Sequence, residues 1–354
     1  MAPAANGGLM LGLGLELAER GTVPLPMLRF GVRRLVASRL ESARAGGGLE
    51  AFLRELEGAP VALVPEAANA QHYELPAEFF TLVLGPHLKY SCAWWPPGVT
   101  RLAEAEAAAL ELTAERAGLA DGQHILELGC GWGSLSLYLA RRFPAARITA
   151  VSNSATQRAF IEARKPANLT VVTADMNGFD PRARFDRVVS VEMFEHMRNW
   201  RALLERIASW LEDDGRLFVH VFCHARYAYP FETAETGDWM GRHFFTGGIM
   251  PAYDLLPRAG DAFALEERWW LDGRHYGRTA AAWRANLEAR RAEAMSVLRR
   301  HYGPDADRWY HRWRLFFLVC EELFGFRGGA EWGVGHYRMA KASRGAALAA
   351  SGTP

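Results

Sequence analysis

Cysteine is scarce in this chain of 354 residues, and its spacing excludes two kinds of protein. The four cysteines stand far apart and form no C-x-x-C pair; they are Cys92, Cys130, Cys223 and Cys320. Zinc sites and disulfide frameworks need closely spaced or numerous cysteines. The sequence therefore predicts no metal site and no disulfide scaffold, and it favours a reducing compartment.

A surplus of one charge and a long apolar run are also missing. The net charge is +1, whereas a protein that binds nucleic acid shows a basic domain or stripe. No segment reaches the roughly 20 apolar residues that cross a bilayer. Residues 8–17 are apolar, but they are few, follow no basic residue and include Glu16, unlike a signal peptide. We therefore expect a cytoplasmic protein with no transmembrane segment and no nucleic-acid partner.

A strand, a glycine-rich turn and a helix follow one another in residues 123–142, which read QHILELGCGWGSLSLYLARR. The strand is apolar apart from Glu127, and Gly129, Gly131 and Gly133 come directly after it. Such a turn lets the backbone approach a ligand and aims helix N–H groups at it. The spacing differs from the dinucleotide fingerprint G-x-G-x-x-G. A carboxylate at Glu127 also suits a ligand with an α-amino group better than a pyrophosphate.

Strands and helices alternate regularly after this turn. Strands are predicted over residues 147–151, 169–173, 186–191 and 217–222, and helices over 155–163 and 200–211. The alternation is typical of an α/β fold with a doubly wound parallel sheet. Ligands bind such sheets at the carboxyl ends of the strands, so the residues just past each strand are the functional candidates.

The flanking segments divide the chain into five predicted parts. They are an N-terminal helical segment (1–64), a lid and pocket wall (65–118), a Rossmann-like core (119–222), a substrate cover (223–341) and a flexible tail (342–354). Further helices are expected at 24–40, 49–56, 102–117, 283–300 and 309–324, an edge strand at 263–271 and a last strand near 335–339. The cover is assigned because such long insertions are usually functional.

The helix predicted at 24–40 carries arginines between its apolar residues: Arg29, Arg33, Arg34 and Arg39. A basic amphipathic helix can lie on an anionic membrane surface. Docking of this helix on its own domain is the favoured interpretation.

Eight spaced motifs resemble those of SAM-dependent methyltransferases of the cyclopropane-fatty-acid synthase and plant coclaurine N-methyltransferase type. The motifs are HYE-x-P-x-EFF, KYSC, E-L-G-C-G-x-G, Ser/Asn-x-x-x-Gln, EMFEH, FVH-x-FCH, FFTGG-x-MP and HY-x-x-T-x-x-x-W. They begin at His72, Lys89, Glu127, Ser152, Glu192, Phe218, Phe244 and His275. The resemblance covers about residues 65–340. It implies a class I methyltransferase fold, with an N-terminal helical segment and a C-terminal helical cover.

The resemblance implies S-adenosylmethionine (SAM) as the cofactor. Carried over by position, its site comprises Tyr90, Ser91, Glu127, Gly129, Gly131, Ser152, Asn153 and Gln157, with Asp175 and Met176 flanking the adenine. Most class I methyltransferases place an acid after the second strand to hold the ribose. Here Ser152 and Asn153 stand in its place, as in the family pattern.

In the first interpretation the methyl acceptor is a small amine. A protonated amine has no lone pair, so the site must bind the ammonium form and then remove a proton. The EMFEH form resembles the N-methyltransferases and implies that Glu195 binds or deprotonates the amine, His196 assists and Glu192 completes an acidic pocket. Glu74 would add a second negative wall. Aromatic residues of the cover would suit an aromatic or cationic substrate; these are Phe244, Phe245 and Trp332.

In the second interpretation the acceptor is the double bond of an unsaturated phospholipid acyl chain. Methyl transfer then leaves a carbocation that must lose a proton, and cyclopropane synthases hold bicarbonate for this step. The resemblance places the bicarbonate ligands at Cys92, Glu195, His220 and Tyr276. Glu192 stands against this interpretation, because a fixed charge is costly beside an acyl chain.

N-methylation of a small amine is the leading prediction, and methyl or methylene transfer to a phospholipid is the alternative. A SAM-binding fold that serves only as an interaction module is disfavoured by the intact glycine turn and the acidic cluster. The sequence leaves peripheral membrane contact and a homodimer open.

Overall fold

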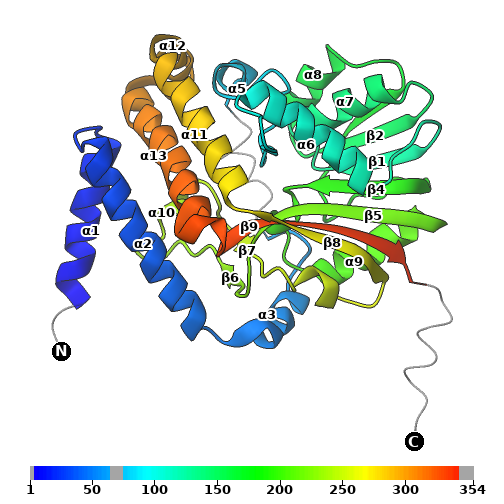
Figure 1. The fold of residues 1–354 in the computed structure, drawn as a ribbon, viewed down its shortest axis with the longest axis horizontal. Coiled ribbons are helices and arrows are strands. Elements are labelled where there is room, and N and C mark those ends of the chain that lie inside the picture. The colour runs from blue at the N-terminus through cyan, green and yellow to red at the C-terminus, as the bar shows by residue number, and fades with distance from the viewer. Residues whose placement is uncertain (1–3, 64–74, 343–354) are drawn as a thin grey trace, which may run out of the picture.

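A seven-stranded sheet forms the centre of the computed structural model, which describes residues 4–63 and 75–342 (Figure 1). The strand order is β3-β2-β1-β4-β5-β9-β8. The strands are β1 (His124–Leu128), β2 (Arg147–Ser152), β3 (Leu169–Thr173), β4 (Phe185–Val191), β5 (Leu211–His224), β8 (Phe263–Asp272) and β9 (Trp332–Lys341). The predicted doubly wound sheet and its edge strand are confirmed.

The sheet is mixed: β1 to β5 run parallel, as the alternation of strands and helices predicts, and one later strand is reversed. Strand β9 pairs antiparallel with both β5 and β8, whereas the other pairs are parallel. Trp332 at the start of β9 lies opposite His224 at the end of β5. The chain therefore re-enters the sheet at the carboxyl edge, because a helical insertion at that edge separates β8 from β9.

Helices cover both faces of the sheet. One face carries α6 (Leu102–Arg116), α7 (Ser134–Arg142) and α8 (Ala155–Glu162), and the other carries α3 (Gly48–Glu57) and α9 (Trp200–Trp210). Neighbouring residues of β1 point to opposite faces: Ile125 joins the first apolar cluster and Leu126 the second. Both are fully buried, which explains why the strand reads as a continuous apolar run.

The segment predicted to be a substrate cover contains three long helices between β8 and β9: α11 (Arg274–Ala289), α12 (Arg291–Tyr302) and α13 (Ala306–Gly325). A single helix over 283–300 was predicted, and this prediction was wrong. Arg290, with φ −108° and ψ 32°, breaks the helix although neither glycine nor proline marks the place. The break allows α12 to pack against α13 and against α5 (Ala77–Val83).

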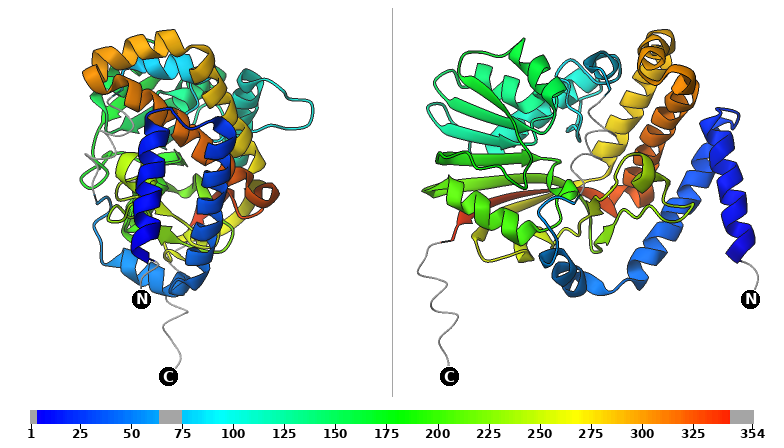
Figure 2. Two further views of the ribbon diagram at one scale, coloured as in Figure 1. Left: turned by 90° about the vertical axis from the view of Figure 1, so that its left-hand side faces the viewer. Right: turned by 180° about the vertical axis from the view of Figure 1, so that it is seen from behind.

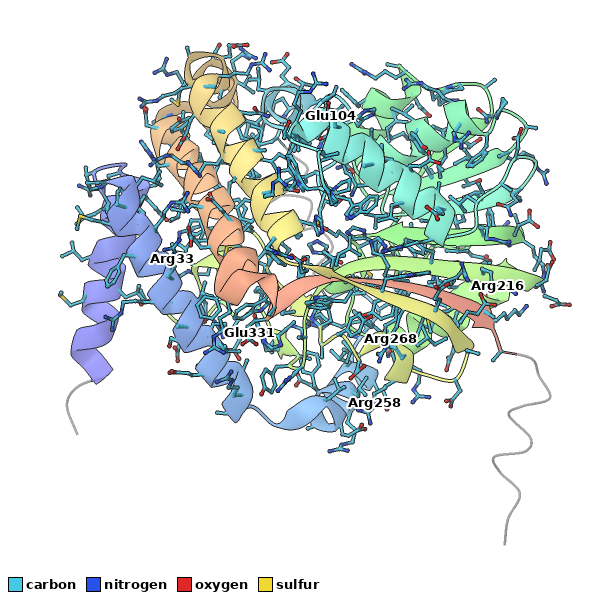
Figure 3. All side chains as sticks on the ribbon, in the orientation of Figure 1. Arg33, Glu104, Arg216, Arg258, Arg268 and Glu331 are labelled. Atoms are coloured by element: carbon cyan, nitrogen blue, oxygen red, sulfur yellow. The ribbon has the colours of Figure 1, made fainter. Side chains whose placement is uncertain are left out.

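The N-terminal helices α1 (Ala4–Glu19) and α2 (Leu25–Ala45) form a pair at the end of the molecule away from the sheet (Figure 2). Helix α2 buries Val32 and Val36 on its inner side. Nη2 of Arg29 lies 2.6 Å from Oε1 of Glu321 on α13. Arg33, labelled in Figure 3, pairs with Glu322. The basic helix therefore docks on its own chain, as the favoured interpretation predicted.

Short elements fill the segment between β5 and β8: β6 (Tyr229–Pro230), α10 (Trp239–His243) and β7 (Ile249–Met250). Among the described residues, no helix is both long enough and apolar enough to span a bilayer. The predicted tail from residue 343 lies outside the described residues, and so do His72 and Glu74.

Candidate functional site

Two adjoining cavities of about 60 and 70 Å³ lie at the carboxyl ends of β1 and β2. Gly129, Gly131 and Gln157 line both of them. The remaining residues of the predicted cofactor set line one or the other: Tyr90, Ser91, Glu127, Ser152, Asn153, Asp175 and Met176. The fold thus brings together all ten residues, which come from four separate stretches of the chain.

The glycine turn is shaped to admit a ligand. Gly129 and Gly131 have φ angles of 82° and 53°, in the left-handed region that favours glycine. A Cβ at Gly129 would lie 2.7 Å from Cβ of Met193, so the turn packs tightly there. A Cβ at Gly131 would meet nothing within 4 Å. The backbone at Gly131 therefore faces open space, where a cofactor can approach it closely.

Unpaired and charged groups around these cavities fit a zwitterionic ligand such as SAM. Nε2 of Gln157 is buried without a hydrogen-bond partner among the described residues, while its Oε1 accepts a bond from Oγ of Ser152 at 2.7 Å. Burial raises the pKa of Glu127 to about 7. Burial also lowers the pKa of the Lys89 ammonium, which donates to Ser91. Lys89 was not among the residues predicted for this site, although it begins the KYSC motif.

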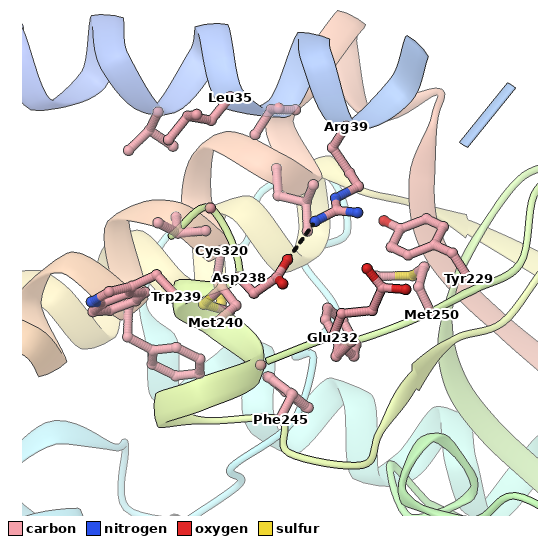
Figure 4. Close-up of a pocket in the computed structure, with 18 of the residues that line it drawn as sticks. Leu35, Arg39, Tyr229, Glu232, Asp238, Trp239, Met240, Phe245, Met250 and Cys320 are labelled. Carbon is pink, nitrogen blue, oxygen red and sulfur yellow. Dashed lines mark ion pairs between the residues drawn. The ribbon is translucent and has the colours of Figure 1, made fainter. Parts of the chain in front are cut away.

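The two cavities described above are called the cofactor cavities here, because the residues predicted to bind SAM line them. A third cavity, of about 530 Å³, adjoins them and is walled by α2, α11, α13 and the segment around α10 (Figure 4). Glu192 lines all three cavities, and His196 lines this one and one cofactor cavity. Of the aromatic side chains expected in the wall, only Phe245 lines it. Phe244 and Trp332 are instead wholly buried in the packing of the cover.

The carboxylate of Glu192 is held by three donors from distant parts of the chain. Its Oε1 accepts from the backbone N–H of Cys92 at 2.9 Å and lies 3.1 Å from Nε2 of His220, and its Oε2 accepts from the hydroxyl of Tyr276 at 2.6 Å. The φ angle of Glu192 is 49°, a strained value for a residue with a side chain. Burial raises the pKa of Glu192, and the Lys89 charge and the donors oppose that rise.

Glu195 sits in the same cavity in a different environment. It is 1% exposed, and neither carboxyl oxygen receives a hydrogen bond from another described residue. Burial raises the pKa of Glu195 well above its usual range, and the nearby charge of Glu192 raises it further. Two neighbouring acids with separated pKa values are typical of acid–base sites.

His196 lies beside Glu195 on the short 3-10 helix (Phe194–His196) that follows β4. Its ring stacks on Phe245 with centroids 5.6 Å apart. Burial lowers the pKa of His196 to about 4, although Glu192 opposes this. The imidazole is therefore neutral at pH 7.

Part of the wall of the large cavity is polar, and no sequence motif indicated it. A nitrogen of Arg39 on α2 lies 3.6 Å from the carboxylate of Asp238 (Figure 4), and the guanidinium also stands over the ring of Tyr229. Glu232 is exposed beside them and has no ion pair with a described residue. These side chains meet only because α2 packs across the segment before α10.

Comparison with known proteins places the chain in a family. Residues 64–329 match the family model described as mycolic acid cyclopropane synthetase. The (S)-coclaurine N-methyltransferase of Papaver somniferum is 34% identical over 298 residues, which are 82% of this chain and 85% of that protein.

Two solved structures share the fold. A coclaurine N-methyltransferase bound to N-methylheliamine and SAH superposes with a TM-score of 0.88 at 33% identity, covering 92% of this chain and 98% of that one. The cyclopropane synthase MmaA2 of Mycobacterium tuberculosis superposes with a TM-score of 0.68 at 25% identity, covering 79% and 99%. This chain therefore belongs to the family that unites cyclopropane synthases and coclaurine N-methyltransferases, and it is a SAM-dependent methyltransferase.

Proposed function

We propose that this enzyme methylates the nitrogen of an apolar, ring-containing amine. The observation that carries the proposal is the position of the Glu192 carboxylate. Cys92, His220 and Tyr276 are three of the four residues that the resemblance assigns to bicarbonate, and all three contact this carboxylate instead. A side chain thus occupies the place expected for the ion. This supports an acceptor that benefits from a fixed negative charge, and it disfavours an acyl chain.

The acidic residues would divide the work of handling an ammonium group. Glu192, kept in place by its donors, provides a negative charge that attracts the cation. Both carboxyl oxygens of Glu195 lack a hydrogen-bond partner among the described residues, and a bound ammonium would favour the ionised form, in which both can accept N–H bonds. Because burial raises the pKa of Glu195 and lowers that of His196, the ionised Glu195 carboxylate is the stronger base and takes the proton, and neutral His196 assists. The amine is then free to attack the methyl group, which SAM supplies in activated form when it is bound.

The shape of the large cavity supports the substrate class. Its volume of about 530 Å³ lies in the range of pockets that bind drug-sized ligands. Aromatic rings stand around its acidic end, namely Phe245, Tyr276 and Trp283. Aromatic faces attract cations, so a ring-bearing ammonium fits this wall better than a small aliphatic one does.

An acceptor screen tests the proposal. Release of SAH would be followed over a panel of cyclic secondary and tertiary amines, and over vesicles of unsaturated phosphatidylethanolamine with and without bicarbonate. We expect turnover of cyclic amines and none on the vesicles. Turnover on vesicles that increases with bicarbonate, together with no amine turnover, would replace the proposal by the lipid alternative.

SAM binding is expected to release a proton from Glu127. With a pKa of about 7, this carboxyl is roughly half protonated in the free protein at pH 7. A cofactor ammonium placed beside it would favour the ionised form, so roughly half a proton would be released on binding. Calorimetric titration in two buffers of different ionisation enthalpy measures this number, and Glu127→Gln should abolish the release.

Glu106 provides the matched control for this measurement. Burial raises its pKa to about 7 as well, but its carboxylate accepts bonds from the backbone amides of Gly85 and His87, and it does not line either cofactor cavity. Glu106→Gln should therefore preserve the proton release. Equal release from wild type and Glu127→Gln would show that the cofactor ammonium lies elsewhere.

A further inference from the structure

A line of buried hydrogen bonds reaches Glu192 from the far end of α6. Nη1 of Arg116, the last residue of α6, lies 2.9 Å from Nδ1 of His336. Nε2 of His336 lies 2.8 Å from Nδ1 of His220. Nε2 of His220 lies 3.1 Å from Oε1 of Glu192. The two histidines are cross-strand neighbours on β5 and β9, and they are 2% and 1% exposed.

The chemistry of the first residue fixes the direction of every bond in this line. A guanidinium carries only donors, so Nδ1 of His336 must accept and bears no proton. Both histidines are neutral, because burial lowers the pKa of each well below its usual range. Nε2 of His336 therefore carries the proton and donates to Nδ1 of His220. Nε2 of His220 in turn carries a proton and donates it to Glu192.

We infer that Arg116 and His336 are positioning residues that fix His220 as a donor and thereby keep Glu192 ionised. Without Arg116, His336 could adopt the other tautomer and accept a bond from Nδ1 of His220. Nε2 of His220 would then be an acceptor facing Oε1 of Glu192. Two acceptors face each other at low cost only if the carboxyl is protonated, so the neutral form of Glu192 would be favoured.

The inference concerns one line of contacts among several around Glu192. The other titratable groups near Glu192 among the described residues are Lys89, Cys92, Glu195, His196, Tyr276 and Cys320. Lys89 also acts on both histidines, and Arg116 is further influenced by Glu115, Tyr253 and Glu267. None of these groups replaces the hydrogen bond from Arg116 to His336, so the tautomers depend on Arg116 specifically.

The pH dependence of catalysis tests the inference, and this readout rests on the proposed function, in which ionised Glu192 is required. In Arg116→Met we expect the acidic limb of kcat/KM to move to higher pH by roughly one to two units, as for the loss of a hydrogen bond to a charged group. His336→Leu should move the acidic limb in the same direction. Arg116→Lys keeps a cationic donor and His336→Gln keeps one donor and one acceptor, so both should retain most of the wild-type profile.

Arg338→Met is the matched control. Arg338 lies two residues from His336, and its guanidinium stands over the ring of Trp269 at 5.8 Å, as that of Arg116 does at 4.8 Å. Its Nη1 donates to the backbone carbonyl of Arg116 at 3.3 Å, a bond that Arg116→Met keeps, and no hydrogen bond joins Arg338 to either histidine among the described residues. Its removal should leave the acidic limb where it is, and an equal shift in Arg338→Met and Arg116→Met would overturn the inference.

Nitrogen-15 NMR of the imidazoles gives a second test, which uses the wild-type protein alone and needs no substrate. In the wild-type protein both His220 and His336 should show the pattern of the neutral Nε2–H tautomer. A proton on Nδ1 of either ring would overturn the inference. Correct tautomers with no amine turnover would overturn the proposed function alone.

Discussion

Replacement of Glu192 by glycine is expected to lower kcat/KM for the amine roughly 10²–10⁴-fold. The variant loses the charge that attracts the ammonium. Glycine adopts the φ angle of 49° without strain, so the backbone should keep its course. The remaining space is then ringed by the N–H of Cys92, His220 and the hydroxyl of Tyr276.

Formate or bicarbonate should restore part of the lost activity in Glu192→Gly. Both are planar anions of carboxylate size, and three donors already point at the vacated position. Glu195→Gly is the matched control: its carboxyl receives no hydrogen bond from another described residue, so no anion should rescue it. Steady-state rates of both variants, measured against formate concentration, test for this rescue. Full amine turnover by Glu192→Gly without any added anion would contradict the acidic-pocket argument.

Replacement of Gly131 by leucine is expected to weaken SAM binding by roughly a hundredfold or more, about 2.7 kcal/mol. A Cβ at this position meets no protein atom within 4 Å, so the side chain would project into the cofactor space rather than into the core. The left-handed φ of 53° costs about 1–2 kcal/mol of stability in addition. Calorimetry with SAM measures the affinity, and thermal unfolding measures the stability.

Gly122→Leu separates these two effects. Gly122 has a φ angle of 80° and also has open space around its Cβ position, but it lies in the turn before β1 and lines neither cofactor cavity. This variant should lose similar stability and bind SAM normally. If both variants bind SAM with wild-type affinity, the glycine turn does not seat the cofactor.

The sequence determined those features that depend on neighbouring residues. The apolar run of β1 followed at once by Gly129 and Gly131 predicts a strand and a close-approach turn, because burial and left-handed φ angles each restrict residue type locally. The alternation of strands and helices predicts the sheet, and with it the edge at which Asp175, Glu192 and Glu195 gather. The spaced motifs supplied the residues that are predicted to bind the cofactor.

The tertiary structure decided which side chains meet. The bonds of Glu192 to Cys92 and Tyr276 join residues 100 and 84 positions apart, and the bond from Arg116 to His336 spans 220. No local periodicity encodes such pairs, because each depends on how whole elements pack: α6 on the sheet, β9 beside β5, and α11 over the carboxyl edge. The reversed direction of β9 and the break at Arg290 have the same origin. Local sequence determined the edge of the sheet at which the candidate site lies, and packing determined that a side-chain carboxylate stands among the groups expected to hold an ion.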